Sequence, residues 1–175
     1  MNFLSKSMPV AAGTLAIGLS LAPAAKAATQ DVWYVTSPGD SCQLSIPTTD
    51  TQVRPRASGY RNEGSSNQFV ICGWGSSVQH SMVVANLVVQ SMDGMAHDMT
   101  CTFTTSSDAV APLTYVSVTQ QVPASGINYY QLHGGMVGGT FGMPFSTSRL
   151  SVTCILPANV ALVELQNQQR IEIGD

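Results

Sequence analysis

The sequence predicts an all-β fold, an antiparallel β-sandwich of Ig-like or jelly-roll style with about nine to ten short strands. Residues 149–157 give the best single indication, because apolar side chains there alternate with Ser and Thr. A period of two is the pattern of a strand with one buried and one solvated face. Pro157 ends this strand, since proline has no N–H to donate to a sheet. Other short segments repeat the pattern with turn residues between them, and no helical period occurs in residues 28–175.

The expected strands follow one another along the chain. They are residues 32–36, 42–46, 68–72, 82–90, 99–104, 113–122, 128–132, 149–156, 160–165 and 169–173. We expect strands 82–90 and 99–104 to form a hairpin around Asp93-Gly94. Residues 48–67 are polar and predict one long loop. The glycine-rich residues 134–142 lack the Gly-Lys-Ser/Thr ending of a phosphate-binding loop and predict a flexible hairpin loop.

Residues 1–27 have the features of a secretory signal peptide. Lys6 supplies a positive start, residues 8–25 are apolar or small, and Ala25-Lys26-Ala27 is a small-x-small cleavage pattern. We therefore expect cleavage before Ala28 and a single β-sandwich domain over residues 28–175, located in the periplasm or secreted. No later stretch is long and apolar enough to span a bilayer, so no membrane span is expected after signal removal.

The charge of the expected domain argues against two classes of partner. Both lysines, Lys6 and Lys26, lie in the signal, which leaves five arginines against ten carboxylates and a formal charge of −5. Nucleic acid and anionic membranes need clustered positive charge on the protein that binds them. The composition therefore predicts no nucleic-acid partner.

Four cysteines, at positions 42, 72, 101 and 154, lie in the expected domain. An even number in an exported chain indicates two disulfides, and the absence of any Cys-x-x-Cys pair disfavours zinc and thioredoxin-like chemistry. Three pairings are possible; we favour Cys42–Cys72 and Cys101–Cys154. On the chain-entropy account these would contribute about 3.7 and about 4.2 kcal/mol. We expect them to tie the two sheets together.

Two groups of residues are candidates for binding a ligand through the loops. Arg54, Arg56 and Arg61 lie in the long polar segment, where guanidinium forks could hold an anion or carboxylate. Trp74, Tyr129 and Tyr130 are aromatic candidates for stacking on a sugar. Glycines flank Trp74 and could let its ring lie against backbone, although packing in the core or at an edge is the commoner use of such a ring. A carbohydrate or a protein surface is the ligand class that these residues favour.

A methionine-rich segment suggests copper as an alternative. Its candidate ligands are Met92, Met95, His97 and Met99. Thioether and imidazole groups suit Cu(I), and the segment resembles the Met-rich stretches of periplasmic copper-handling proteins. The opposing interpretation is a Met-rich turn that lies over the core, since methionine fills irregular gaps.

The sequence favours a protein that is not an enzyme. It has no Gly-x-Ser-x-Gly elbow, no histidine in the context of a general base, and no cysteine expected to be free as a nucleophile. We therefore expect no cofactor other than the possible copper.

Short segments spread over the expected domain carry a family resemblance. They are Ser41-Cys42, Asn62 with Phe69-Val70-Ile71-Cys72, Met99-Thr100-Cys101 and Cys154-Ile155-Leu156-Pro157. In these segments the sequence resembles a group of uncharacterised exported bacterial β-rich proteins. The resemblance implies a compact exported β domain with two disulfides, and it brings no activity or functional residue. The chain departs from the expected pattern at Gly73, where proline would follow the cysteine.

The function that the sequence favours is that of an exported, non-enzymatic binding or interaction module. The alternatives are the copper carrier and a subunit of a surface fibre. In the fibre, residues 32–36 would leave their own sheet and add to a neighbour.

Overall fold

The structure is a computed structural model that describes residues 28–45, 52–74, 82–107, 110–147 and 149–173. The predicted signal peptide, residues 1–27, lies outside the described residues. The regular secondary structure of the described chain is almost entirely strand. The strands are β1 (Thr29–Thr36), β2 (Cys42–Leu44), β3 (Val53–Arg56), β4 (Gly59–Asn62), β5 (Gln68–Gly73), β6 (Met82–Ser91), β7 (His97–Ser106), β8 (Thr114–Val122), β9 (Ile127–His133), β10 (Arg149–Leu156) and β11 (Val160–Glu172). A single turn of helix, α1 (Pro38–Ser41), and a 3₁₀ turn, η1 (Gly134–Met136), complete the elements.

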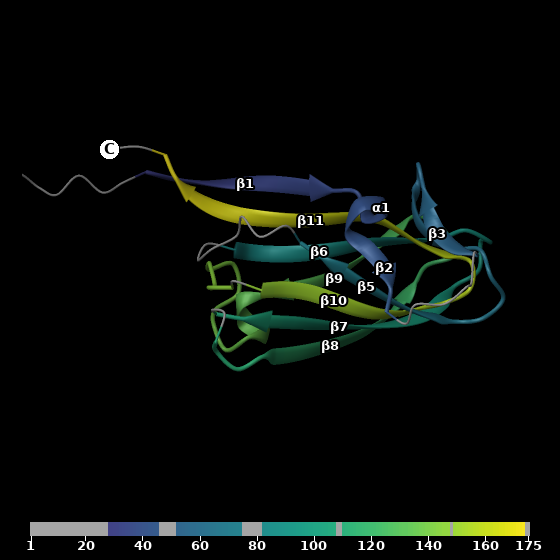
Figure 1. Cartoon of the computed structure of the whole chain (residues 1–175). Helices are drawn as coiled ribbons and strands as arrows, with labels where there is room; N and C mark the ends of the chain where they lie inside the picture. The colour runs from purple at the N-terminus through teal and green to yellow at the C-terminus, as the bar shows by residue number, and fades with distance from the viewer. Residues whose placement is uncertain (1–27, 46–51, 75–81, 108–109, 148, 174–175) are drawn as a thin grey trace, which may run out of the picture.

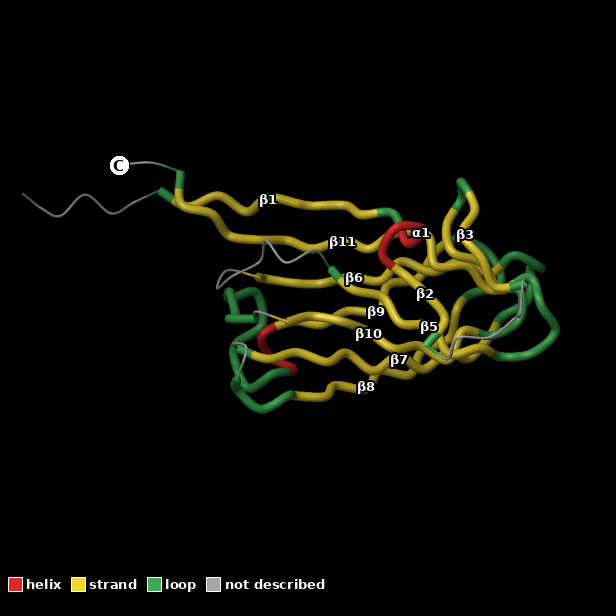
Figure 2. Tube along the Cα trace, in the orientation of Figure 1, coloured by secondary structure: helices red, strands yellow, loops and turns green. Residues whose placement is uncertain are grey.

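The strands form two antiparallel sheets, which confirms the predicted sandwich. Sheet A has the order β3-β4-β11-β6-β9, with β1 also paired to β11, and sheet B has the order β2-β5-β10-β7-β8. The strands β4 to β11 follow the two-sheet order of a jelly roll, which is one of the two styles that the sequence leaves open. The strands run along the long axis of the sandwich (Figure 1), and turns gather at its two ends (Figure 2).

The core lies between the sheets and is filled by alternate residues of each strand. In sheet A, the register aligns Leu165, Leu87 and Tyr130, and all three are fully buried. In sheet B, the alternation predicted for β10 is present, since Val152, Cys154 and Leu156 are buried. Burial of such side chains stabilises the fold by about 1.5–3 kcal/mol each.

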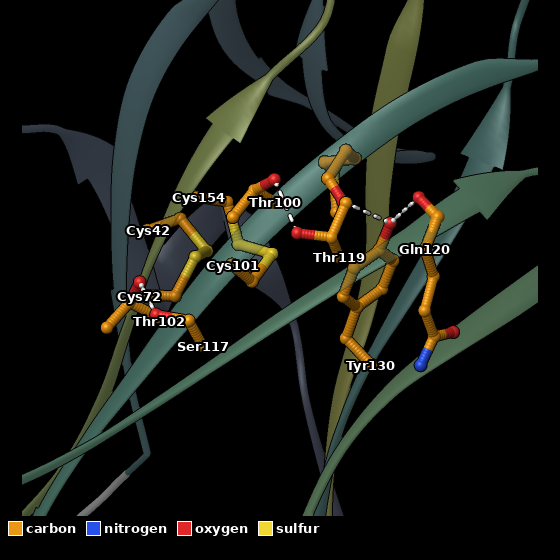
Figure 3. The surroundings of a disulfide bond; sticks show 11 residues. Cys42, Cys72, Thr100, Cys101, Thr102, Ser117, Thr119, Gln120, Tyr130 and Cys154 are labelled. Atoms are coloured by element: carbon orange, nitrogen blue, oxygen red, sulfur yellow. Dashed lines mark hydrogen bonds between the residues drawn. A yellow bond between two sulfur atoms is a disulfide. The ribbon is translucent and has the colours of Figure 1, made fainter.

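Both favoured disulfides are present, but each lies within sheet B. Cys42 faces Cys72 across β2 and β5, and Cys101 faces Cys154 across β7 and β10. Figure 3 shows the two bonds beside each other on this one sheet. The expectation that they tie the two sheets together is therefore wrong. The reason is the register, which places each pair directly opposite on neighbouring strands with their Cα atoms 4.1 Å apart.

Polar contacts between the sheets come instead from aromatic side chains and an amide. The Tyr130 hydroxyl of β9 lies 2.9 Å from the Met99 carbonyl oxygen and 2.7 Å from that of Gln120, both in sheet B (Figure 3). Burial of this hydroxyl raises the pKa of Tyr130 to about 12. The Trp74 indole N–H, at the end of β5, donates to the Gln166 carbonyl oxygen of β11. The Asn62 amide of β4 donates to the Leu156 carbonyl oxygen of β10.

Three local predictions are corrected by the structure. The described part of the polar segment 48–67 is a hairpin, β3–β4, rather than one loop. Its turn needs Gly59, because φ is +122° and a Cβ there would collide with the Leu162 carbonyl oxygen. Strands β6 and β7 belong to different sheets, so they are not a hairpin around Asp93-Gly94. The two closing strands are one strand, β11, in which the polar residues 166–170 separate two apolar stretches.

Candidate ligand-binding face

The candidate site lies on the side of sheet A that points away from sheet B, which we call the outer face. Strand alternation assigns its residues, because each neighbour of a buried core residue points outward. The register aligns one outward residue from each of four strands in a single row. These are Trp33 of β1, Gln168 of β11, Val84 of β6 and His133 of β9. The row brings together residues that are a hundred positions apart in the sequence.

A hollow of about 250 Å³ lies over this row. It is lined by Trp33, Val83, Val84, Gln131, His133, Phe141, Gly142 and Gln168. Two of its walls are exposed aromatic rings, since Trp33 is 49% and Phe141 is 73% solvent-exposed. Exposed aromatic side chains of this size around a concave surface are typical of binding sites.

The glycine-rich segment brings Phe141 to the hollow. After β9 the chain turns through η1, where Val137 and Gly139 both donate backbone N–H groups to the Gly134 carbonyl oxygen. A Cβ on Gly134 would lie 2.7 Å from the Thr140 carbonyl oxygen, so the tight return needs glycine there. The Phe141 ring then meets the His133 imidazole edge-to-face, with centroids 4.7 Å apart. The segment is therefore folded back on β9, which fixes one aromatic wall.

The remaining walls supply hydrogen-bonding groups. Gln131 and Gln168 carry amides, each of which can donate and accept. In the described part of the chain, the His133 Nδ1 atom is buried and has no hydrogen-bond partner. The Asn86 Oδ1 atom, on the same face, is also buried without a partner there. A ligand with both apolar and hydroxyl surfaces can bind here. Its apolar surface can pack on the aromatic rings, and its hydroxyls can bond to polar groups that have unused hydrogen-bonding capacity.

The charged side chains near the hollow form hydrogen bonds with neighbouring side chains. Arg170 donates to the Asp31 carboxylate from Nε at 2.7 Å and from Nη2 at 3.0 Å. These hydrogen bonds lower the pKa of Asp31. The Glu164 carboxylate accepts a hydrogen bond from the Gln166 amide at 2.7 Å. The floor of the hollow is uncharged, which suits a neutral ligand or a neutral part of a larger one.

The three predicted arginines gather at the other end of the same face. Arg54 and Arg56 of β3 donate to the Glu63 carboxylate, with Nη2 atoms 3.1 and 2.7 Å from Oε2. Arg61 of β4 lies further away, with Nη1 4.0 Å from Oε1. Hydrogen bonds from Arg56 and then Arg54 lower the pKa of Glu63 to about 2. We call Arg54, Arg56, Arg61 and Glu63 the arginine cluster.

The predicted aromatic candidates are only partly at the surface. Trp74 is 7% exposed and stacks on Phe103, with ring centroids 6.0 Å apart, and Tyr130 is fully buried. Neither ring is accessible to a sugar. Tyr129 is 38% exposed and lies on the outer face, opposite Val88. The sequence reasoning missed Trp33, although alternation within 32–36 was the signal that could have assigned it to a surface.

The predicted copper ligands occupy different environments. Met99 is a core residue with 1% exposure, whereas Met95 is 63% exposed. The His97 Nε2 atom lies 2.9 Å from Asp93 Oδ1. Within the described ranges, no group of three or more His, Cys, Asp or Glu side chains could hold a metal ion. Copper binding through Met92, Met95, His97 and Met99 stays a prediction.

The strand proposed to exchange in a fibre is paired in the structure. Residues 32–36 belong to β1, which pairs with β11 over its whole length. Fibre assembly stays a prediction. Among the described residues, no helix has the length and apolar composition needed to cross a bilayer. The two disulfides indicate an oxidising compartment.

Comparison with known proteins yields similarity only among solved structures. No protein-family model matches the chain. No curated protein matches it. One similar structure is TmCBM61 bound to β-1,4-galactotriose, with 7% identity, a TM-score of 0.34 and coverage of 81% of this chain and 88% of that one. Another comprises the CBM22-1 and GH10 modules of Clostridium thermocellum endo-1,4-β-D-xylanase 10B with xylohexaose, at 10% identity and a TM-score of 0.37; the match covers 82% of this chain and 26% of that one. A third is a CBM4 structure, with 9% identity and a TM-score of 0.32; the match covers 79% of this chain and 86% of that one. At these TM-scores the likenesses carry no conclusion about this chain.

Proposed function

We propose that the protein is a non-enzymatic carbohydrate-binding domain that uses the hollow on the outer face of sheet A. The observation that carries the proposal is the pairing of two exposed rings, Trp33 and Phe141, with amide and imidazole walls. A sugar ring has an apolar face of C–H groups and a rim of hydroxyls. The Trp33 indole can stack on the apolar face, and the hydroxyls can form hydrogen bonds with Gln131, Gln168 and His133.

We also propose that this binding takes place outside the cytoplasm, in the periplasm or after secretion. The proposal is supported by the signal pattern of residues 1–27 together with the two disulfides. N-terminal sequencing of the exported protein should begin at Ala28. A mature protein that retains residues 1–27 would contradict it.

A glycan-array screen followed by calorimetry tests the binding proposal. We expect the protein to bind at least one glycan. Trp33→Ala should weaken that binding about 30-fold, and Phe141→Ala about tenfold, because each removes an aromatic wall of the hollow. Tyr115→Ala is the matched control, since Tyr115 is 64% exposed on β8 of sheet B. Equal losses in Trp33→Ala and Tyr115→Ala, or binding to no glycan, would contradict the proposal.

A further inference from the structure

The arginine cluster has more positive charge and more hydrogen-bond donors than its carboxylate uses. Three guanidiniums surround one carboxylate, and each guanidinium carries five N–H donors. The Glu63 carboxylate accepts four hydrogen bonds, all from Arg54 and Arg56. The Arg61 Nε atom is buried and has no hydrogen-bond partner among the described residues. The cluster therefore has an excess of two positive charges and an unused buried donor.

The surroundings leave these guanidiniums accessible. The side chains of Arg54, Arg56 and Arg61 are 46%, 42% and 34% exposed. Residues 28–175 carry a formal charge of −5 and five arginines, and three of these arginines lie in the cluster. A local positive patch on an acidic protein attracts anions to that part of its surface.

Register places the arginine cluster on the same face as the hollow. Tyr60 is opposite Leu162, and both side chains belong to the core. Arg61, the next residue, is opposite Ala161 and therefore points to the outer face. Arg54 is opposite Arg61 on β3, and Arg56 follows two positions later on the same side. All three guanidiniums thus share the outer face with Trp33 and His133.

Strand β11 sets the separation between the two sites. The arginine cluster adjoins its start at Ala161, and the hollow adjoins Gln168. Seven residues of strand span about 23 Å. Glu164 and Gln166 lie on the outer face between these points. A single extended chain of sugars along β11 could therefore contact both sites.

We propose that the ligand is an acidic polysaccharide, with carboxylate or sulfate groups, that lies along β11. A neutral part of a sugar ring stacks in the hollow while an anionic group binds the arginine cluster through a guanidinium fork. Arginine suits this role because its planar donors match the oxygens of carboxylate and sulfate two at a time. This inference rests on the proposed carbohydrate function and specifies the chemical class of its ligand.

The inference also assigns an opposing role to Glu164. Its carboxylate lies on the path between the two sites and would repel an acidic ligand. Glu164→Gln should therefore strengthen binding of acidic oligosaccharides about twofold to threefold and leave neutral ones unchanged.

Calorimetry with three oligosaccharides of equal length tests the proposal, one neutral, one bearing uronate groups and one sulfated. We expect an acidic oligosaccharide to bind about tenfold more tightly than the neutral one at low salt, and this advantage to shrink in 0.5 M NaCl. Arg54→Gln and Arg56→Gln should each remove most of the advantage. Arg149→Gln, which removes the same charge from β10 of sheet B, is the control and should change nothing. The uronate and sulfate arms distinguish the two sources of negative charge.

The outcomes separate this inference from the proposed function. Neutral oligosaccharides that bind as well as acidic ones, with Trp33→Ala weakening both, would overturn the acidic-ligand proposal and leave the carbohydrate function standing. Equal effects of Arg54→Gln and Arg149→Gln would overturn it as well. Binding to none of the three, nor to any other glycan, would overturn both.

Discussion

The outer faces of the two sheets both carry polar side chains, yet these side chains are arranged differently. On sheet B, short hydroxyl side chains of β7 and β8 point outward and pair with one another, and exposed Phe69, Tyr115 and Ile155 lie on the same sheet. Thr100 bonds to Thr119, and Thr102 bonds to Ser117, each at 2.9 Å between oxygens (Figure 3). On sheet A the outward residues are longer, and amide, imidazole and guanidinium groups lie beside exposed rings.

The difference shows that polarity alone does not identify a binding face. A hydroxyl that already has a neighbour as its partner gains little from a ligand, because it must give up one hydrogen bond to form another. Asn86 Oδ1 and Arg61 Nε have no hydrogen-bond partner within the part of the chain that the structure describes, so such atoms have a hydrogen bond to gain. Sheet B, which also holds both disulfides, is in this account the structural layer, and sheet A is the binding layer.

The largest expected effect comes from the disulfides of sheet B. Replacing Cys101 and Cys154 together by alanine should lower the free energy of unfolding by about 4.2 kcal/mol, and replacing Cys42 and Cys72 by about 3.7 kcal/mol. Urea unfolding measures both. If sheet B is only structural, sugar affinity at 10 °C should be unchanged in whichever variant stays folded. Lost affinity in a fully folded variant would break the comparison.

A smaller effect is expected at the contact between the layers. Tyr130→Phe removes the hydroxyl, whose one O–H lies within hydrogen-bond distance of two carbonyl oxygens of sheet B, and should cost about 1–2 kcal/mol. Tyr129→Phe is the matched control, one residue away and partly exposed, and should cost less than about 0.5 kcal/mol. Equal costs in chemical denaturation would show that the hydroxyl of Tyr130 does not link the sheets.

The hydroxyl pairs of sheet B should contribute little. Thr102→Val breaks the pair with Ser117 at an exposed position and should change the free energy of unfolding by less than about 1 kcal/mol. Sugar binding should not change at all. A loss of sugar affinity in this variant would show that part of the binding site lies on sheet B.

The acid dependence of stability should be the weakest of these effects. The folded pKa of Glu63, about 2, lies below its ordinary value of 4.5, so the unfolded chain takes up a proton first as the pH falls. The stabilisation is complete above pH 4.5 and is lost between about pH 4.5 and 2. Urea midpoints should therefore fall across this window, and Glu63→Gln should flatten the fall. A urea midpoint that rises as the pH falls would contradict the lowered pKa of Glu63 in the folded protein.

Much of the fold follows from the sequence, because alternation and turn residues are local signals. β10 shows this best, since its alternation gave its bounds and its buried face. The sequence did not predict the hairpin β3–β4, because β3 is exposed along most of its length. It contains Pro55 and two arginines and therefore has no alternating apolar pattern. The polar residues 166–170 of β11 interrupt its apolar pattern and made one strand look like two.

The candidate site was harder to predict because register brings it together. Nothing near Trp33 in the sequence indicates that Gln168, Val84 and His133 will share its row. The two tryptophans illustrate the difficulty: flanking glycines made Trp74 look exposed, whereas Trp33 sits in an ordinary strand pattern. Burial depends on the opposite sheet, which covers Trp74 and leaves Trp33 at the surface.

The most direct test of the account is an NMR titration of the isotope-labelled protein with a glycan that it binds. The account predicts that signals from Trp33, His133 and Gln168, on the outer face of sheet A, shift on binding. Signals from Thr100, Thr102 and Thr119, on the outer face of sheet B, should stay in place. Shifts confined to the threonines of sheet B, with Trp33 unmoved, would contradict it.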